Sequence, residues 1–443
     1  MKFLRQLVLL IIGISICALP LNGQSIDVNK LKKIRLKTYL AGGLMWKGES
    51  TQNTNWNKIC ESPDGKIWFC GGDHWGTEEI TGHWSMADRY DRLYGFGNTA
   101  VNSYDPKTDG TEVEFELDRI SSLYSNVESP GHGKIHAGIL SDSKGNIYTA
   151  GYLGSSFIHE YTQAYFPKSY VGSAVIKYEP STGDYDYYNI PCPGGGIVAL
   201  CYDEDRNIMN GISVDRAKFW RINLSTMELN IYESVARMSR IKDRVREMIM
   251  DNDGYCYFAN DVGGLTKFNP DTEIFTDIDL VLPGRYMDFR ASVVSSKNIV
   301  YCITTDGFVF SFDPKTNKIE DYGHIVGRPD VIFYTPNIAL DEERGRLYFL
   351  AGSHGTGDNE LTKAWGTLTI LDIKTKKYYW VGVVDGNEGS FGSVVGNDHN
   401  VYFSSFGYEY DDNGEIVNNK RGQPWTRPYL LKYEPPENLN TLE

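Results

Sequence analysis

The sequence has no excess of basic residues and no long apolar segment beyond its N-terminus. Its 44 Lys and Arg are outnumbered by 58 Asp and Glu, which gives a formal net charge of -14. Such a chain offers no basic field that would neutralise phosphates, which argues against nucleic acid as a partner. After residue 23 no segment is apolar for long enough to cross a bilayer, so no membrane span is predicted.

The first 23 residues have the features of a secretory signal peptide. Lys2 and Arg5 precede an apolar run, and small and polar residues follow that run. We therefore expect cleavage after Gly23, a secreted or periplasmic protein, and a mature chain of residues 24–443. Cys17 lacks the small preceding residue that a lipoprotein anchor requires.

Six cysteines follow the signal, and their spacing matches no metal site or disulfide framework. Cys60 and Cys70 flank one expected hairpin turn, so a disulfide between them is open. The other cysteines are expected to be small apolar residues inside strands. The sequence also lacks Gly-x-Ser-x-Gly, a phosphate loop and a dinucleotide fingerprint, and it requires no cofactor, although a structural metal ion stays open.

Aromatic residues are abundant, with 30 Tyr and 19 Phe, and they recur in short runs between turns rich in Gly, Pro, Asp and Ser. The clearest copy, residues 131–189, reads as four strands, here named A to D: IHAGILSD, NIYTAGY, SAVIKYEP and DYDYYNI. B strands recur seven times along the chain, beginning near Lys66, Asn146, Asn207, Tyr255, Ile299, Arg346 and Asn400. Each is followed by a C strand that runs into a turn such as DPKT, EPST or NPDT.

Seven copies of this unit predict an all-β fold, a seven-bladed β-propeller of four-stranded antiparallel blades in a single domain over residues 24–443. The acid of the C–D turn is expected to cap exposed amides, and proline presets the turn dihedral. The last unit lacks a D strand, whereas residues 33–40 (KIRLKTYL) alternate like a strand and have no hairpin partner. We expect this N-terminal strand to pair with residues 429–433 and close the ring.

Loop lengths predict two unlike faces. The top face carries the B–C loops and the connections between blades, and the bottom face carries the A–B and C–D turns. The bottom turns are tight, whereas four consecutive blades carry long top insertions, at residues 71–97, 151–172, 352–366 and 407–428. Long loops without periodicity are usually functional. We therefore predict an asymmetric cleft over the central channel on the top face.

Arginine, histidine and aromatic residues gather in these top loops. Arginine binds carboxylate or sulfate in bidentate fashion and aromatic faces stack on sugar rings, so the expected partner is an acidic polysaccharide or oligosaccharide. Arg216 is expected near the same opening and, like the other arginines, is equally consistent with surface ion pairs. The residues expected to bind the ligand are His132, Arg246, Arg290, His74, Trp75 and Tyr161.

His136 begins an A strand and is a candidate general acid or base, although a structural histidine fits the position equally well. His132 has a spacing from it that occurs in metal sites. In an extended chain, however, the two rings would lie roughly 13 Å apart, so no metal site is predicted. Acidic residues in the top loops leave a glycoside hydrolase open, but no spacing selects a catalytic pair.

The sequence resembles the seven-bladed propeller polysaccharide lyases, in particular the ulvan lyases. The resemblance lies in GKIHAGILSDSKGNIYTAGY, GSAVIKYEPSTGDY and PGGGIVALCYDEDRNIMNGISVDRAKFWRINL. It implies catalysis by a histidine at the start of an A strand, a second histidine at the end of the next B strand, a tyrosine and an arginine. His136 matches the first position and Tyr152 stands at the second. Met209 is nearest the tyrosine position, and Arg216 or Arg221 would supply the arginine.

Three functions stay open at this point. The leading hypothesis is an exported polysaccharide lyase that cleaves a uronate-containing glycan by β-elimination. Arginine would neutralise the carboxylate, and His136 or Tyr152 would move the proton. The alternatives are a non-catalytic glycan-binding or scaffold propeller and a carboxylate-dependent glycoside hydrolase. The fold alone does not choose among them, because propellers carry many chemistries.

Overall fold

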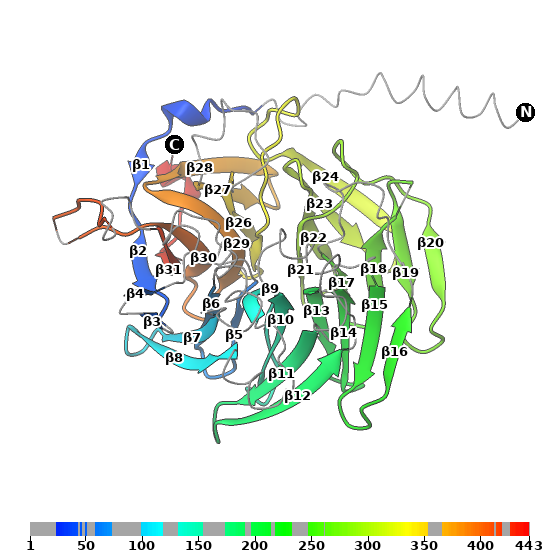
Figure 1. Ribbon diagram of the computed structural model, residues 1–443. Helices are drawn as coiled ribbons and strands as arrows, with labels where there is room; N and C mark the ends of the chain where they lie inside the picture. The colour runs from blue at the N-terminus through cyan, green and yellow to red at the C-terminus, as the bar shows by residue number, and fades with distance from the viewer. Residues whose placement is uncertain are drawn as a thin grey trace, which may run out of the picture.

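The computed structural model describes residues 24–42, 45–46, 49–50, 58–72, 99–117, 132–153, 173–190, 196–213, 218–232, 247–260, 262–352, 366–411, 413–418 and 426–442. These residues form seven antiparallel four-stranded blades around a central channel, a seven-bladed β-propeller (Figure 1). The fold prediction is therefore confirmed. Over the same ranges, no helix has both the length and the apolar character needed to cross a membrane.

The first three blades follow the expected A-to-D order. Blade 1 consists of β5 (Cys60–Glu61), β6 (Ile67–Gly71), β7 (Ala100–Asp105) and β8 (Gly110–Glu116). Blade 2 consists of β9 (His132–Ser141), β10 (Ile147–Leu153), β11 (Ser173–Glu179) and β12 (Asp184–Ile190). Blade 3 consists of β13 (Ile197–Asp203), β14 (Ile208–Ser213), β15 (Lys218–Asn223) and β16 (Leu229–Tyr232).

The remaining four blades repeat the pattern. Blade 4 consists of β17 (Ile249–Met250), β18 (Cys256–Ala259), β19 (Leu265–Phe268) and β20 (Phe275–Ile278), and blade 5 of β21 (Ala291–Val294), β22 (Val300–Ile303), β23 (Phe308–Asp313) and β24 (Lys318–His324). Blade 6 consists of β25 (Ala339–Asp341), β26 (Arg346–Ala351), β27 (Thr367–Asp372) and β28 (Lys377–Val384). Blade 7 consists of β29 (Asn387–Val395), β30 (Val401–Tyr408) and β31 (Thr426–Tyr433), and β2 (Lys37–Leu40) completes it. A separate hairpin joins β3 (Met45–Trp46) to β4 (Glu49–Ser50).

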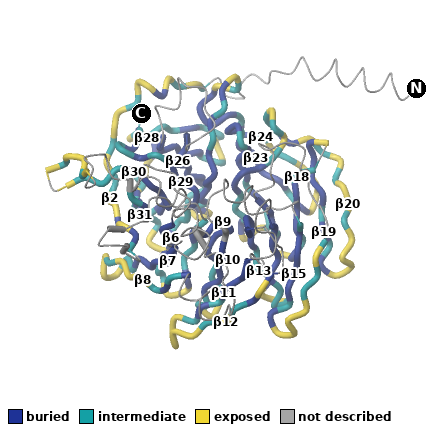
Figure 2. Tube along the Cα trace, in the orientation of Figure 1, coloured by how far each residue is buried: buried dark blue, intermediate teal, exposed yellow. Residues whose placement is uncertain are grey.

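Burial explains why the B and C strands are the most apolar. All five residues of β6 and all six of β26 are buried, because neighbouring blades cover both faces of these strands. The outer strand β12 instead alternates between exposed and partly buried residues over its first half. Figure 2 shows exposed residues gathered at the outer turns and buried residues in the inner strands. The core is thus a set of layers between blades.

The N-terminal segment closes the ring, but it does so with two short strands where one was expected. Strand β2 pairs antiparallel with β31, and Lys37 faces Lys432 while Leu40 faces Tyr429, as predicted. Strand β1 (Lys33–Ile34) instead pairs in parallel with β28 and becomes a fifth strand of the sixth blade. Two intervening residues carry the chain from one blade to the next. Residues 24–40, called the N-terminal strap below, therefore tie two blades together.

The bottom turns of blades 2 and 4 share one hydrogen-bonding scheme. In blade 2, Asp142 accepts the backbone N–H of Asn146 at 2.8 Å, and the Tyr148 hydroxyl donates to the same carboxylate at 3.1 Å. Asp251 accepts from the Tyr257 hydroxyl in the same way, at 2.8 Å. An acid at the turn and an aromatic residue six positions later therefore form one unit that recurs in the propeller.

The disulfide left open between Cys60 and Cys70 does not form. Cys60 lies opposite Trp68 and Cys70 lies opposite Val101, so the two side chains are not cross-strand neighbours. Cys60 is not in a disulfide, and burial raises the pKa of its thiol well above the usual value.

Candidate functional site

Several strands that line the channel carry bulges at one common height. Register shifts occur at Val198 in β13, at Phe391 in β29 and over residues 136–138 in β9. In blade 5 the N–H of Arg290 donates to the carbonyl of Ile303 at 2.7 Å, although Ile303 is already paired with the next residue along β21. Each bulge lies four to six residues before the bottom turn of its strand. The bulges of blades 2, 3, 5 and 7 therefore lie at one level around the channel, and they are called the ring of bulges below.

Bulges re-aim side chains and are common next to active sites. In blade 2 the bulge contains Gly138, whose φ of +103° is a backbone conformation that suits glycine. A Cβ atom at this position would lie 3.0 Å from Cβ of Lys58. Glycine is thus required both by the backbone and by the lysine side chain that passes beside it.

Arg290 is the best-defined functional candidate on the ring. Its residue is only 8% exposed, and its Nε donates to the Tyr334 hydroxyl at 2.6 Å. The guanidinium carbon lies 5.4 Å from the centroid of the Tyr334 ring. No described residue accepts a hydrogen bond from Nη1 or Nη2 of Arg290. Because Nε is committed to tyrosine, these two groups are left to bind an anion.

Aromatic rings continue from this arginine toward the seventh blade. The ring of Phe391 lies 6.5 Å from that of Tyr334, and it stacks on Phe406 at 6.2 Å with an interplanar angle of 16°. Phe391 occupies one of the bulges in β29. Arg290 and Phe391 thus come from two different bulges, and Tyr334 contacts both.

The sixth blade contributes an asparagine at the same level. Asn337 exchanges two hydrogen bonds of 2.8 Å with the backbone of Leu350, and its Nδ2 also donates to the carbonyl of Ser390 at 3.2 Å. A side-chain amide here replaces a backbone pairing and reaches the bulged strand of the next blade. This arrangement holds the bulge of blade 7 in place.

An ion pair spans the channel below the bulges. Lys58 at the start of the first blade contacts Glu247 at the start of the fourth, and the Ser292 hydroxyl donates to the same carboxylate oxygen at 2.9 Å. The Lys58 side chain is 35% exposed and that of Glu247 is 4% exposed. In a seven-membered ring these blades face each other, so the contact crosses the opening.

Asp288, two residues before Arg290, is the nearest acid along the chain. Thr305 donates to both carboxylate oxygens of Asp288, at 2.9 Å through its N–H and at 2.6 Å through its hydroxyl. Burial raises the pKa of Asp288, and this favours its neutral form. The Thr305 hydrogen bonds and the charge of Arg290 act against this shift, so Asp288 and Arg290 attract each other.

The two well-described top-face histidines differ in role. His136 lies in the bulge of β9 and is 6% exposed. The Nδ1 atom of His324 accepts two backbone N–H groups, from Val326 and Arg328, and its Nε2 pairs with the carbonyl of Asp306 at 2.9 Å. Burial lowers the pKa of His324 to about 4, so this histidine is a neutral structural residue.

The structure describes only part of the predicted site. His132 faces Leu153 and Tyr152 faces Lys134 in the pairing of β9 with β10, so their backbones lie beside the bulge of His136. Arg290 and His136 lie on the ring of bulges. The other predicted site residues fall outside the described residues: Arg216, Arg246, His74, Trp75 and Tyr161.

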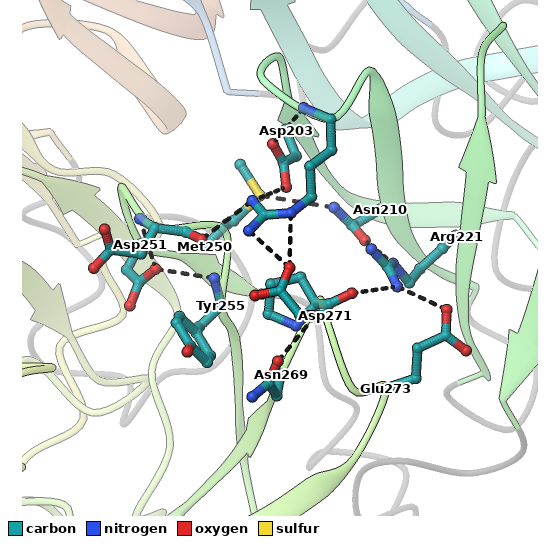
Figure 3. A network of polar contacts seen from close by, with 12 residues as sticks. Asp203, Asn210, Arg221, Met250, Asp251, Tyr255, Asn269, Asp271 and Glu273 are labelled. Carbon is teal, nitrogen blue, oxygen red and sulfur yellow. Dashed lines mark hydrogen bonds and ion pairs between the residues drawn. The ribbon is translucent and has the colours of Figure 1, made fainter.

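Arg221, the alternative catalytic arginine, belongs to the contact between blades 3 and 4. It is 5% exposed, and it donates to Asn210 at 3.2 Å, to the Pro270 carbonyl at 3.2 Å and to Glu273 at 3.0 Å (Figure 3). Its guanidinium also lies 5.1 Å from the Phe268 ring. The Arg221 side chain is therefore used to hold blades 3 and 4 together.

Sequence reasoning missed five residues of the channel: Lys58, Glu247, Tyr334, Asn337 and Phe391. One signal was available, because each A strand enters the channel a fixed distance before its bottom turn. Counting back four residues from the turn acids Asp251 and Asp341 gives Glu247 and Asn337. Tyr334 carries no such signal, since it lies in an irregular connection.

Comparison with known proteins supports the fold. No protein-family model matches this sequence, and no curated protein matches it. The structure resembles the extracellular domain of BT4673 from B. thetaiotaomicron, with a TM-score of 0.50 and 13% identity over 86% of this chain. The chain spans only 40% of the length of that domain.

Propellers from other settings are equally similar. The WD40 repeats of RRP9 match with a TM-score of 0.51 and 8% identity, over 90% of this chain and 100% of theirs. The structure of U3-55K matches with a TM-score of 0.52 and 8% identity, over 90% of this chain and 99% of its own. At such low identity these similarities establish a propeller fold.

Proposed function

We propose that this protein is an exported propeller that binds a carboxylate-bearing sugar of an acidic polysaccharide at the top of its channel. Arg290 carries the proposal, because it is nearly buried, fixed by Tyr334, and left with two free N–H-bearing groups. A guanidinium presents such groups in a plane that matches a carboxylate. The Tyr334 ring supplies an aromatic face beside it, and the buried Phe391 packs against Tyr334.

Export rests on two observations. The N-terminal 23 residues have the composition of a signal peptide. In addition, one of the similar structures is an extracellular domain. Expression of the full chain with its own N-terminus, followed by mass spectrometry of the exported product, tests this part of the proposal. A mature chain that starts at Gln24 is the expected result, and full-length protein retained in the cell would contradict it.

Binding is tested with a panel of uronate-containing and sulfated polysaccharides in affinity electrophoresis. The expected result is retardation by uronate polymers, which Arg290→Met abolishes and Arg290→Lys only weakens. Lysine keeps the charge but loses the planar bidentate geometry. Equal retardation of the wild type and Arg290→Met would place the binding surface elsewhere and contradict the proposal.

A polysaccharide lyase is the second candidate, and the placement of His136 favours it. This histidine lies in a channel-lining bulge at the level of Arg290, which suits a base that removes a proton acidified by carboxylate neutralisation. His136 is only 6% exposed, however, so a polysaccharide has little access to its ring, and binding therefore ranks above catalysis as the proposed function. The assay is the absorbance of unsaturated uronide product. Turnover that disappears in His136→Ala while binding persists would establish the lyase.

A further inference from the structure

Glu247 is a nearly buried carboxylate that uses only part of its hydrogen-bonding capacity. Its Oε1 atom receives both the Lys58 ammonium and the Ser292 hydroxyl. No described residue donates a hydrogen bond to Oε2. An ionised carboxylate offers about four acceptor sites, and a buried one is costly unless those sites are used. Oε2 is therefore an acceptor that is open to a donor from outside the protein.

The position of this acceptor is next to the channel opening. The Lys58 side chain that reaches Glu247 is 35% exposed, so solvent reaches the ion pair. Ser292, the other partner of Glu247, follows Arg290 by two residues at the start of β21. Two residues of a strand span roughly 7 Å. Oε2 of Glu247, as acceptor, and Nη1 and Nη2 of Arg290, as donors, thus belong to one neighbourhood whose size suits a single sugar residue.

We propose that Glu247 selects for hydroxyl groups on the ligand, so that the site recognises a uronate rather than any carboxylate. Arg290 binds the carboxylate, and Oε2 of Glu247 accepts a hydrogen bond from a ring hydroxyl. This inference rests on the proposed function, because it assigns a second contact to the same ligand. A site built to hydrogen-bond a hydroxyl rejects an analogue without it, since the buried acceptor is left unpaired.

Two probes separate the roles of the two residues. Glucuronate and cyclohexanecarboxylate share a six-membered ring and a carboxylate, but only glucuronate carries hydroxyls. Titration of each probe into the full-length mature protein, followed by calorimetry or NMR, gives the ratio of their dissociation constants. We expect the wild type to prefer glucuronate by at least about tenfold, the effect of one hydrogen bond to a charged acceptor.

The informative variant is the double substitution Lys58→Met with Glu247→Met, which removes one positive and one negative charge and so keeps the net charge of the site. In this variant the ratio of the two dissociation constants is expected to fall toward one, because the preference for glucuronate is lost. Lys58→Met alone is the matched control and keeps the preference, because Glu247 stays. Glu247→Gln retains a neutral acceptor and should show an intermediate ratio. Circular dichroism confirms that each variant is folded.

The possible failures are distinguishable. If the double variant keeps the wild-type ratio, Glu247 does not read hydroxyls and this inference is overturned while the carboxylate site stands. If the wild type binds neither probe, or if Arg290→Met binds both as well as the wild type does, the proposed function itself is contradicted. A ratio near one in the wild type also overturns the role of Glu247.

Discussion

Asp109 is the residue at which the ring-closing strand meets the first blade. Its carboxylate accepts hydrogen bonds from Tyr39 at 2.5 Å and from Tyr104 at 2.9 Å, and it also contacts Lys37. Lys37, Tyr39 and Tyr104 together hold the pKa of Asp109 well below its usual value of 3.8. A single acid thus links β2 to blade 1.

We expect Asp109→Asn to lower the melting temperature at neutral pH. A carboxylate with a depressed folded-state pKa stabilises the protein above its unfolded-state pKa, and this contribution is lost as the pH falls below 3.8. The difference in melting temperature between wild type and variant should therefore shrink on acidification. Scanning calorimetry from pH 7 to pH 2 measures it, and a difference that stays constant would contradict the assignment.

His324 is a base rather than an acid, but it makes the stability of the folded protein depend on pH in the same direction. Its folded-state pKa of about 4 lies below the ordinary 6.5, so the folded state binds fewer protons than the unfolded state between these values. Stability due to this residue is present above pH 6.5 and declines toward pH 4. The decline from pH 6.5 to pH 5 is about 2 kcal/mol at 1.36 kcal/mol per pH unit.

This prediction is tested by urea unfolding of wild type and His324→Gln at pH 7 and at pH 5. We expect the wild type to lose more of its free energy of unfolding than the variant does, by about 2 kcal/mol. Glutamine cannot take up a proton and so lacks this component. Equal losses in both proteins would show that His324 is charged in the folded state.

At the scale of elements, the channel-lining A strands differ from the B and C strands of each blade. The B and C strands pair regularly and are buried, whereas several A strands bulge where they pass the channel. A bulge places an extra residue opposite its partner strand and turns side chains out of the regular alternation. The ion pair of Lys58 with Glu247 crosses the space that these strands enclose.

The ion pair should behave as a coupled unit. Lys58→Met leaves the carboxylate of Glu247 nearly buried without its counter-ion, which we expect to cost about 3 kcal/mol of unfolding free energy. Glu247→Met should cost less, because Lys58 is partly exposed. The double variant is expected to lie close to the wild type. A double-mutant cycle by chemical unfolding measures the coupling, and additive single effects would exclude it.

The repeated elements were predictable because each one carries its own local signal. Acidic turns such as that of Asp142, followed by an aromatic B strand, recur with fixed spacing, and every expected B strand is present. The bulges were not predictable, since they depend on how neighbouring blades meet. The contact of Lys58 with Glu247 joins residues 189 positions apart, and no local pattern indicates it.

At the scale of the whole molecule, the N-terminal strap ties the ring together. Val28 is 1% exposed and packs in the core shared by blades 5 and 6, β1 joins blade 6 and β2 completes blade 7. The sequence indicated the closure because residues 33–40 alternate and lack a partner. The division into β1 and β2 depends on the gap between two blades, which the sequence pattern does not encode.

Deletion of the strap should destabilise the entire ring. A chain that begins at residue 41 loses β1, β2 and the seam at Asp109, and it exposes the edge of β31. We expect a fall in melting temperature of roughly 3 to 4 °C, as for a loss of about 3 kcal/mol in a domain of this size. A chain that begins at residue 24 is the control. An unchanged melting temperature would contradict the role of the strap.

We propose that Arg290 binds the carboxylate of the ligand. Isothermal titration of a uronate oligosaccharide into wild type, Arg290→Lys and Arg290→Met tests it most directly. We expect measurable binding by the wild type, an affinity reduced about tenfold or more in Arg290→Lys, and no binding by Arg290→Met. All three proteins should retain the same melting behaviour within a few degrees. Identical isotherms for the three proteins would contradict the account.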